Sequence, residues 1–241
     1  MSFGFRVFAA AALIVHSLSA CSNGEADGSA AREQVSAKPS VASTADVEQG
    51  KLVLAFGDSL YAGYGVLPQQ SFPWRLQEAL KARGVVATVR NAGVSGDTTA
   101  AGRQRLAYTL DGLKTTPDLV LVGLGGNDML RGISPEETEA NLRAILEELK
   151  RRNIPAMLTG MVAAPNLGRP FATQFNAIYP ALSREFGVDL YPFFLDEVVT
   201  DPALMQADRI HPNPAGIDRV VAKVTPLVAQ HLKSDAPSAT D

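Results

Sequence analysis

Five short, continuous apolar runs follow one another through this 241-residue chain, and stretches with helical periodicity separate them. Such runs are typical of strands buried on both faces of a parallel sheet. Strands that alternate with helices predict an α/β fold, here a three-layer α/β/α sandwich around a parallel five-stranded sheet with right-handed crossovers. The predicted strands are Lys51–Phe56, Val85–Arg90, Asp118–Leu124, Pro155–Met161 and Val188–Tyr191.

Three amphipathic stretches predict helices that cover this sheet. The clearest start is Ser134, a serine cap followed by Pro135 and two acidic residues. Two later stretches contain Pro180 and Pro226, each of which is expected to bend or weaken its helix. The apolar stripes are Leu142, Ile145, Leu146 and Leu149; Phe171, Phe175, Ile178, Leu182 and Phe186; and Ile217, Val220, Val221, Val224 and Val228.

The two ends of the chain have a different composition. Arg6, the apolar run 7–15 and small residues at 18–20 predict a signal peptide over residues 1–20, because the run is too short to span a bilayer. Residues 21–50 contain few large apolar side chains, which predicts a disordered linker. The folded domain is expected over 51–234, followed by a disordered tail at 235–241.

The overall composition excludes several classes of protein. The net charge is −3, and lysine and arginine are scattered without a basic stripe, which disfavours nucleic-acid binding. Cys21 is the one cysteine, so neither an intrachain disulfide nor a multi-cysteine metal site can form. No metal ion or other cofactor is expected.

Polar, glycine-rich loops follow the first three predicted strands, at 57–59, 91–97 and 125–128. In a parallel sheet the carboxyl ends of the strands lie at one edge, and ligands bind there. The loops contain neither G-x-G-x-x-G nor GK[ST], which disfavours a nucleotide site. The chain also lacks G-x-S-x-G, so the nucleophile-elbow hydrolase fold is not supported.

Ser59 in the first loop is a candidate nucleophile. A serine hydroxyl needs a base to take its proton and a third group to orient that base. Of the three histidines, His16 lies in the predicted signal peptide and His231 in a polar stretch near the C-terminus. His211 is therefore the candidate general base, and Asp208, three residues before it, is the candidate orienting group.

Several motifs together resemble those of the SGNH, or GDSL-type, hydrolases. The runs 57–65 (GDSLYAGYG), 91–99 (NAGVSGDTT) and 124–132 (LGGNDMLRG) and the run 208–212 (DRIHP) carry the resemblance, which covers residues 51–232. They are most similar to a bacterial branch of thioesterase I / protease I / lysophospholipase-like arylesterases. The resemblance implies the flavodoxin-like fold of that family.

The resemblance also implies a mechanism and its residues. Ser59 would attack an acyl carbonyl, His211 would act as base and then as acid, and Asp208 would hold the imidazole. The oxyanion hole would consist of the backbone N–H groups of Ser59 and Gly93 and the side-chain amide of Asn127. The expected activity is hydrolysis of carboxylic esters and thioesters through an acyl-enzyme, with aryl esters, acyl-CoA and lysophospholipids as substrates.

Other interpretations of these residues stay open at this point. Ser59 could merely cap a helix, Ser95 could be the nucleophile, and Asp208 could only cap a turn. Asp58 and Asp128 are expected to be structural carboxylates that accept hydrogen bonds from loop backbone.

Alternatives for the whole protein also stay open. It could be a carbohydrate or cell-wall O-acetyl esterase, or a non-catalytic surface lipoprotein of the same fold. Arg209 stands where the resembled branch has glycine, and it could narrow the site or attract anionic substrates. Sequence does not define the natural substrate.

The run Leu18-Ser19-Ala20-Cys21 resembles the bacterial lipobox, in which the cysteine is lipidated and becomes the mature N-terminus. The alternative is a plain secretory signal. We expect lipidation at Cys21 and a monomer in the periplasm of a bacterial cell envelope, and Ser22 favours the outer membrane.

Overall fold

The computed structural model describes residues 50–234. The predicted signal peptide, Cys21, the predicted linker up to residue 49 and the predicted tail at 235–241 lie outside the described residues. Within residues 50–234, no helix is both long and apolar enough to cross a membrane.

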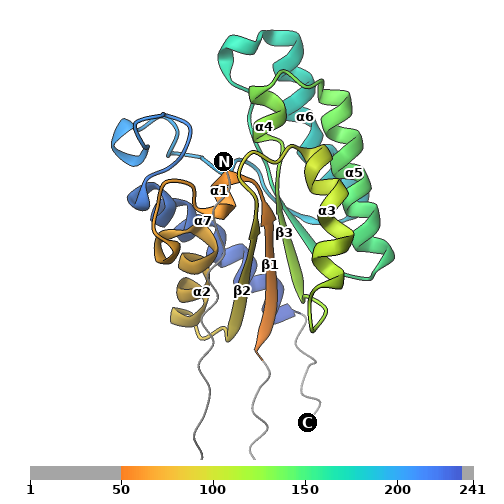
Figure 1. Ribbon diagram of the computed structural model, residues 1–241, viewed down its shortest axis with the longest axis vertical. Coiled ribbons are helices and arrows are strands. Elements are labelled where there is room, and N and C mark those ends of the chain that lie inside the picture. The colour runs from red at the N-terminus through yellow and green to blue at the C-terminus, as the bar shows by residue number, and fades with distance from the viewer. Residues whose placement is uncertain (1–49, 235–241) are drawn as a thin grey trace, which may run out of the picture. The chain divides into compact units, whose positions relative to one another are not determined.

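Five parallel strands form a sheet in the order β2-β1-β3-β4-β5 (Figure 1). All five lie where the apolar runs predicted them, and the predicted fold class is confirmed. β2 begins two residues later than predicted, because the Val85 N–H donates to the Leu80 carbonyl at the end of the preceding helix. The strands are β1 (Lys51–Gly57), β2 (Ala87–Gly93), β3 (Leu119–Gly123), β4 (Ala156–Thr159) and β5 (Asp189–Tyr191).

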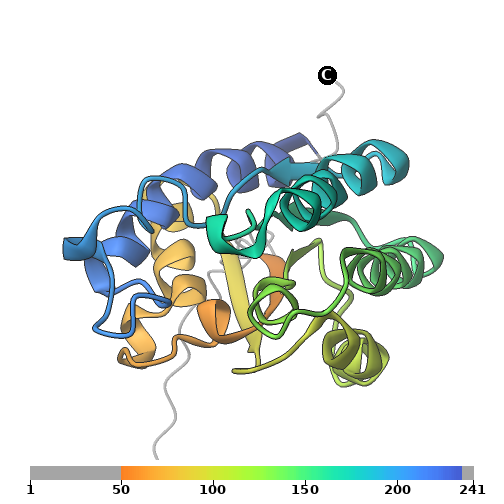
Figure 2. The same cartoon turned by 90° about the horizontal axis from the view of Figure 1, so that it is seen from above.

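Long helices cover both faces of the sheet and complete the three layers. The helices α2 (Phe72–Ala82) and α7 (Pro214–Ser234) pack together on one face (Figure 2). The other face carries α3 (Thr99–Asp111), α5 (Pro135–Arg151) and α6 (Arg169–Phe186). This alternation is the expected consequence of right-handed crossovers between parallel strands.

The predicted helix signals are found with one difference. Ser134 caps α5 by accepting a hydrogen bond from the Glu137 N–H at 3.2 Å. Pro180 and Pro226 lie inside α6 and α7, and neither helix is interrupted. A proline removes one backbone hydrogen bond, and the buried apolar side chains on both sides of it keep the helix packed on the sheet.

Three glycines lie side by side at the carboxyl ends of neighbouring strands. Gly57 in β1 pairs with Gly93 in β2 and with Gly123 in β3. A Cβ at Gly57 or Gly123 would lie 2.6 or 2.5 Å from the Tyr61 ring, and one at Gly93 would lie 2.3 Å from the Ala62 nitrogen. The absence of side chains in this row therefore allows the next helix to sit directly on the end of the sheet.

That helix is α1 (Ser59–Ala62), which follows β1 after one residue. The Tyr61 side chain is buried, and its hydroxyl shares a 2.9 Å hydrogen bond with Thr159 at the end of β4. α1 therefore packs against the ends of β1, β2 and β3, and the hydrogen bond of Tyr61 connects it to β4. Its first residue, Ser59, has a fixed place at the edge where the polar loops meet.

Candidate active site

Asp58 determines how α1 begins. Its side chain accepts a hydrogen bond from the Leu60 N–H at 3.0 Å, and its carbonyl accepts from Tyr61 and Ala62. Asp58 is thus the N-cap of the helix, as expected of a structural carboxylate. Ser59 is the first helical residue and does not cap the helix, so its hydroxyl is available for another partner.

His211 lies in the loop between the 3₁₀ turn η3 (Pro202–Leu204) and α7. An antiparallel bridge between Met205 and Pro212 closes this loop. Inside it, one carboxylate oxygen of Asp208 accepts the N–H groups of Ile210 at 2.9 Å and His211 at 3.0 Å. With this oxygen Asp208 caps a turn, and its other carboxylate oxygen is left for a second partner.

The second carboxylate oxygen of Asp208 lies 2.6 Å from Nδ1 of His211, and Nε2 of His211 lies 2.9 Å from the Ser59 hydroxyl oxygen. The structure therefore brings the three predicted residues into one hydrogen-bonded row across 152 positions of sequence. Burial by itself would raise the pKa of Asp208. Hydrogen bonds from the His211 side chain and from two backbone N–H groups outweigh this effect and lower the pKa to about 2. Asp208 is then an anion that can stabilise an imidazolium.

Gln206 and Tyr64, which were not predicted as site residues, connect the segment after α1 with the loop that carries His211. The Gln206 side-chain amide donates to the carbonyls of Tyr64 at 2.8 Å and Pro212 at 3.0 Å. The Tyr64 ring lies against the His211 ring, with centroids 4.5 Å apart and planes inclined by 33°. Gly63-Tyr64-Gly65 was a visible signal, because an aromatic residue between two glycines is placed by a turn rather than by a core.

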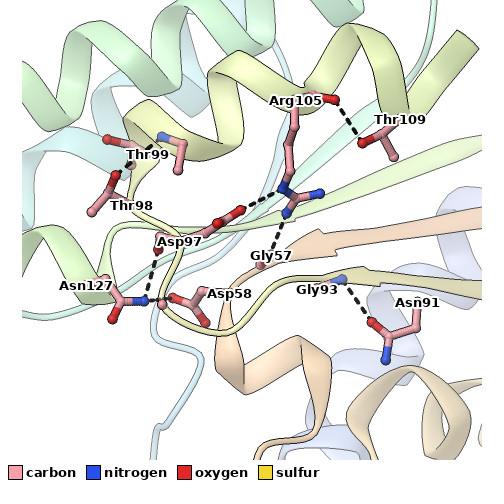
Figure 3. A network of polar contacts seen from close by, with 12 residues as sticks. Gly57, Asp58, Asn91, Gly93, Asp97, Thr98, Thr99, Arg105, Thr109 and Asn127 are labelled. Carbon is pink, nitrogen blue, oxygen red and sulfur yellow. Dashed lines mark hydrogen bonds and ion pairs between the residues drawn. The ribbon is translucent and has the colours of Figure 1, made fainter. Parts of the chain in front are cut away.

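Asn127 enters the site at the start of α4 (Gly126–Leu130). Its amide nitrogen donates to the Asp97 carbonyl at 2.9 Å, and Asp58 lies 3.4 Å from the same nitrogen (Figure 3). The first contact orients the amide. The second is long for a hydrogen bond, so that hydrogen is open to a stronger acceptor such as an oxyanion.

The structure does not support Gly93 as an oxyanion donor, and that prediction is wrong. Its N–H already donates to the Asn91 side chain at 2.9 Å (Figure 3). Gly93 is also the last residue of β2, packed against the backbone of α1, and it is not among the residues that line the site cavity. A glycine is needed here for the close approach of α1, and not for access to substrate.

Gly96, three residues later, has the properties that were expected of Gly93. It lines the cavity, its φ is +88°, and no hydrogen bond between described residues uses its N–H. The Ser59 N–H is equally free within the described part of the chain. Ser95 also lines the cavity, but His211 bonds to Ser59, so the structure does not favour Ser95 as nucleophile. Three residues that line the cavity thus offer hydrogen-bond donors: the N–H groups of Ser59 and Gly96 and the Asn127 amide.

A partly buried ion pair fixes the loop that carries Gly96. The Arg105 guanidinium bonds to the Asp97 carboxylate at 2.6 Å and to the Gly57 carbonyl at 3.0 Å (Figure 3). It also lies 4.1 Å from the centre of the Phe56 ring. This arginine ties the loop to the end of β1, and the loop in turn supplies the carbonyl that orients Asn127.

Two buried carboxylates lie under this loop. Asp128 accepts the Thr99 N–H at 2.9 Å and the Thr99 hydroxyl at 2.5 Å, which agrees with the structural role expected of it. Asp58 is only 3% exposed. Burial raises the pKa of Asp58 to about 7; the Leu60 N–H opposes this rise, while the neighbouring Asp128 and Asp97 add to it.

A cavity of about 670 Å³ opens beside the Ser59–His211 pair, and Asn127 and Gly96 also line it. Its walls are mostly apolar. Among the described residues, no group of three or more His, Cys, Asp or Glu side chains could hold a metal ion. The apolar lining consists of Leu60, Met129, Leu130, Met161, Val162, Ala163, Ala164, Pro165, Phe193, Leu195, Val199 and Ile210.

An α/β/α sandwich with a hydrogen-bonded Ser–His–Asp row, free oxyanion donors and an apolar cavity defines a serine ester hydrolase. The model of the GDSL-like Lipase/Acylhydrolase family matches residues 55–219. The chain belongs to this family, which confirms the resemblance seen in its motifs. It is an enzyme of the esterase and thioesterase type.

Several relatives share most of its length. Thioesterase 1/protease 1/lysophospholipase L1 of Escherichia coli (strain K12) is 41% identical over 180 residues, which are 73% of this chain and 84% of the relative. An arylesterase of Vibrio mimicus is 38% identical over 180 residues, or 75% and 89% of the two chains. The crystal structure of AlinE4, an SGNH-hydrolase family esterase, is 47% identical, covers 78% of this chain and 98% of its own, and has a TM-score of 0.66.

The first prediction concerns the oxyanion donor on α4. Asn127→Ala should lower kcat by about 10²–10³ with a smaller effect on KM, because the lost hydrogen bond is made chiefly in the transition state. Steady-state kinetics on a soluble ester measures both constants. Asn91→Ala removes a similar amide that does not line the cavity, and it should stay within about threefold of wild type. A similar kcat for the two variants would contradict the assignment.

The second prediction concerns Asp58. In the unfolded chain Asp58 ionises near its ordinary pKa of 3.8, whereas in the folded protein it stays neutral up to about pH 7. Its contribution therefore lowers the free energy of unfolding as pH rises from about 4 to 7, by about 4 kcal/mol in total. Asp58→Asn cannot ionise, so its stability relative to wild type should increase across this range.

Urea unfolding followed by circular dichroism at several pH values tests this prediction. Glu78→Gln, on an exposed residue of α2, controls for the change in net charge. If the Asp58→Asn and wild-type stabilities ran parallel from pH 4 to pH 8, Asp58 would be ionised in the fold and the prediction would be wrong.

Proposed function

We propose that this enzyme hydrolyses carboxylic esters and thioesters with medium to long acyl chains, including aryl esters, acyl-CoA and lysophospholipids. The observation that carries the proposal is the apolar cavity of about 670 Å³ that opens at the Ser59 hydroxyl. A cavity of this size can bury an extended acyl chain, and burial of each CH₂ group contributes about 0.8 kcal/mol. The relatives named thioesterase, lysophospholipase and arylesterase support the same range.

In the first half of the reaction, the Ser59 oxygen attacks the acyl carbonyl while its proton passes to Nε2 of His211. Asp208, bonded to Nδ1, keeps the imidazole in the required tautomer and stabilises the imidazolium. The carbonyl oxygen becomes an oxyanion that accepts hydrogen bonds from Ser59, Gly96 and Asn127. Collapse of the intermediate breaks the bond to the leaving group, which takes the proton from His211.

In the second half, a water molecule takes the place of the leaving group beside His211. His211 removes a proton from the water, the resulting hydroxide adds to the acyl carbonyl, and the same donors stabilise the second oxyanion. The bond to Ser59 then breaks, the serine oxygen regains a proton from His211, and the carboxylic acid leaves. The tyrosine ring against His211 favours the imidazolium in both halves by a cation–π interaction.

The cavity walls bear on the alternative that the enzyme removes O-acetyl groups from carbohydrate. A polysaccharide needs hydrogen-bonding side chains along its binding surface, and the lining here is dominated by aliphatic, methionine and phenylalanine side chains. A non-catalytic lipoprotein is disfavoured because the complete Ser–His–Asp row is assembled.

The third prediction tests the activity and its nucleophile. Purified wild type should hydrolyse p-nitrophenyl esters with a kcat/KM that rises from acetyl to octanoyl, since longer chains fill the cavity. Ser59→Ala should remove this activity while the circular dichroism spectrum stays the same. A fluorophosphonate probe should label Ser59, and Ser95→Ala should still be labelled. A preference for acetyl esters over octanoyl would instead favour the carbohydrate esterase.

We also propose that the enzyme works from the periplasmic side of a bacterial membrane, tethered as a monomer through a lipid on Cys21. The lipobox-like run before Cys21 supports this location. The catalytic part needs no helix that spans the membrane if the lipid supplies the attachment.

The fourth prediction tests the anchor. Cys21→Ser in the full chain should abolish incorporation of a radiolabelled fatty acid and release the protein from the membrane fraction. Esterase activity per mole should not change, because Cys21 lies outside the catalytic domain. Wild-type protein found only in the soluble periplasmic fraction would contradict the anchor and leave the catalytic proposal untouched.

A further inference from the structure

The loop that carries His211 holds an arginine in a backbone conformation that favours glycine. Arg209 has a φ of +58°, in the left-handed region, where the backbone of a non-glycine residue is strained. Its side chain is exposed and lines the catalytic cavity. Among residues 50–234, no carboxylate pairs with its guanidinium and no hydrogen bond uses it.

The charges around the cavity leave this arginine uncompensated. The acidic side chain that lines the cavity is Asp58, which is buried and bonded to the start of α1. Asp208, the neighbour of Arg209, is engaged by His211 and by two backbone N–H groups. A free, exposed guanidinium beside apolar walls gives the cavity two chemically different parts.

The chemistry of the leaving group determines which part of a substrate meets Arg209. His211 must deliver its proton to the leaving-group oxygen or sulfur, so the leaving group lies on the side of the His211 loop. Arg209 belongs to that loop, two residues before His211. The apolar walls from the α4 region, including Met129 and Leu130, and those around Met161 take the acyl chain instead.

We infer that Arg209 selects substrates whose leaving group carries an anionic group, a phosphate or a carboxylate, close to the scissile ester or thioester bond. This inference rests on the proposed function, because it requires an acyl substrate in the cavity. A guanidinium donates two parallel hydrogen bonds to either anion, and a charge-assisted contact of this kind is stronger than a neutral one.

The test uses two octanoyl esters that differ in charge at the leaving group. One is the octanoyl ester of 4-hydroxybenzoate, which is anionic, and the other is the octanoyl ester of methyl 4-hydroxybenzoate, which is neutral. The quantity measured is the ratio of kcat/KM for the anionic ester to that for the neutral ester. Comparing this ratio between variants cancels the intrinsic reactivity of the two esters.

Arg209→Ala should lower this ratio by about 3- to 30-fold, the range of a partly exposed charge-assisted contact. Arg209→Lys should retain part of the preference. Arg209→Gly should behave like Arg209→Ala and remain folded, because glycine adopts a positive φ without strain. Arg83→Ala removes an equal charge at the end of α2 and should leave the ratio within about twofold. Raising the salt concentration should lower the ratio in wild type and not in Arg209→Ala.

The possible failures are distinguishable. If wild type hydrolyses neither octanoyl ester, the proposed function fails. If wild type hydrolyses both and the ratio is the same in Arg209→Ala, Arg209→Gly and wild type, the inference about Arg209 is overturned and the proposed function stands.

A phosphate-bearing leaving group could come from two sources, and two further substrates distinguish them. S-octanoyl 2-mercaptoethyl phosphate presents a soluble thioester with a phosphate close to the scissile bond, and lysophosphatidic acid presents a lipid ester with a phosphate headgroup. The source whose hydrolysis falls in Arg209→Ala is the one that Arg209 recognises.

Discussion

The close approach of α1 to the end of the sheet is the constraint on which the rest of the site depends. Gly57, Gly93 and Gly123 form a row without side chains, and Tyr61 fills the space above it. Tyr61 is buried and bonded to Thr159, so α1 cannot shift without breaking contacts to several strands. The nucleophile is therefore placed by the packing of a short helix on a rigid sheet, rather than by a flexible loop.

The other catalytic groups reach Ser59 through two separate polar networks. On one side, Arg105 and Asp97 tie a glycine loop to β1 and orient the Asn127 amide. On the other side, Gln206 holds the histidine loop against the carbonyl of Tyr64. Each network uses side chains to satisfy backbone groups that the loops would otherwise leave unpaired. The same bonds that stabilise the loops thus preorganise donors and base, which is the main source of catalytic power in such sites.

The cavity combines this preorganised edge with an apolar chamber and one exposed cation. Burial of acyl chains supplies binding energy without directional demands, which is consistent with the range of esterase, thioesterase and lysophospholipase names among its relatives. Discrimination between leaving groups must come from the few polar groups near His211. Arg209 is the charged one among them that has no partner within the described residues, and it is held there at a cost in backbone strain.

The strands, the nucleophile and the base could be predicted from the sequence, because buried strands leave continuous apolar runs and because His211 is the one of three histidines placed to serve Ser59. Tertiary structure decided what depends on the direction of a backbone group or on contacts between distant residues. Gly93 and Gly96 look equivalent in sequence, but the Gly93 N–H donates to Asn91, whereas Gly96 lines the cavity and no hydrogen bond between described residues uses its N–H. Gln206 meets Tyr64 across 142 positions, a contact that no local pattern encodes. The left-handed backbone of Arg209 belongs to the loop that the bridge between Met205 and Pro212 closes, and the preference of arginine for other conformations does not predict it.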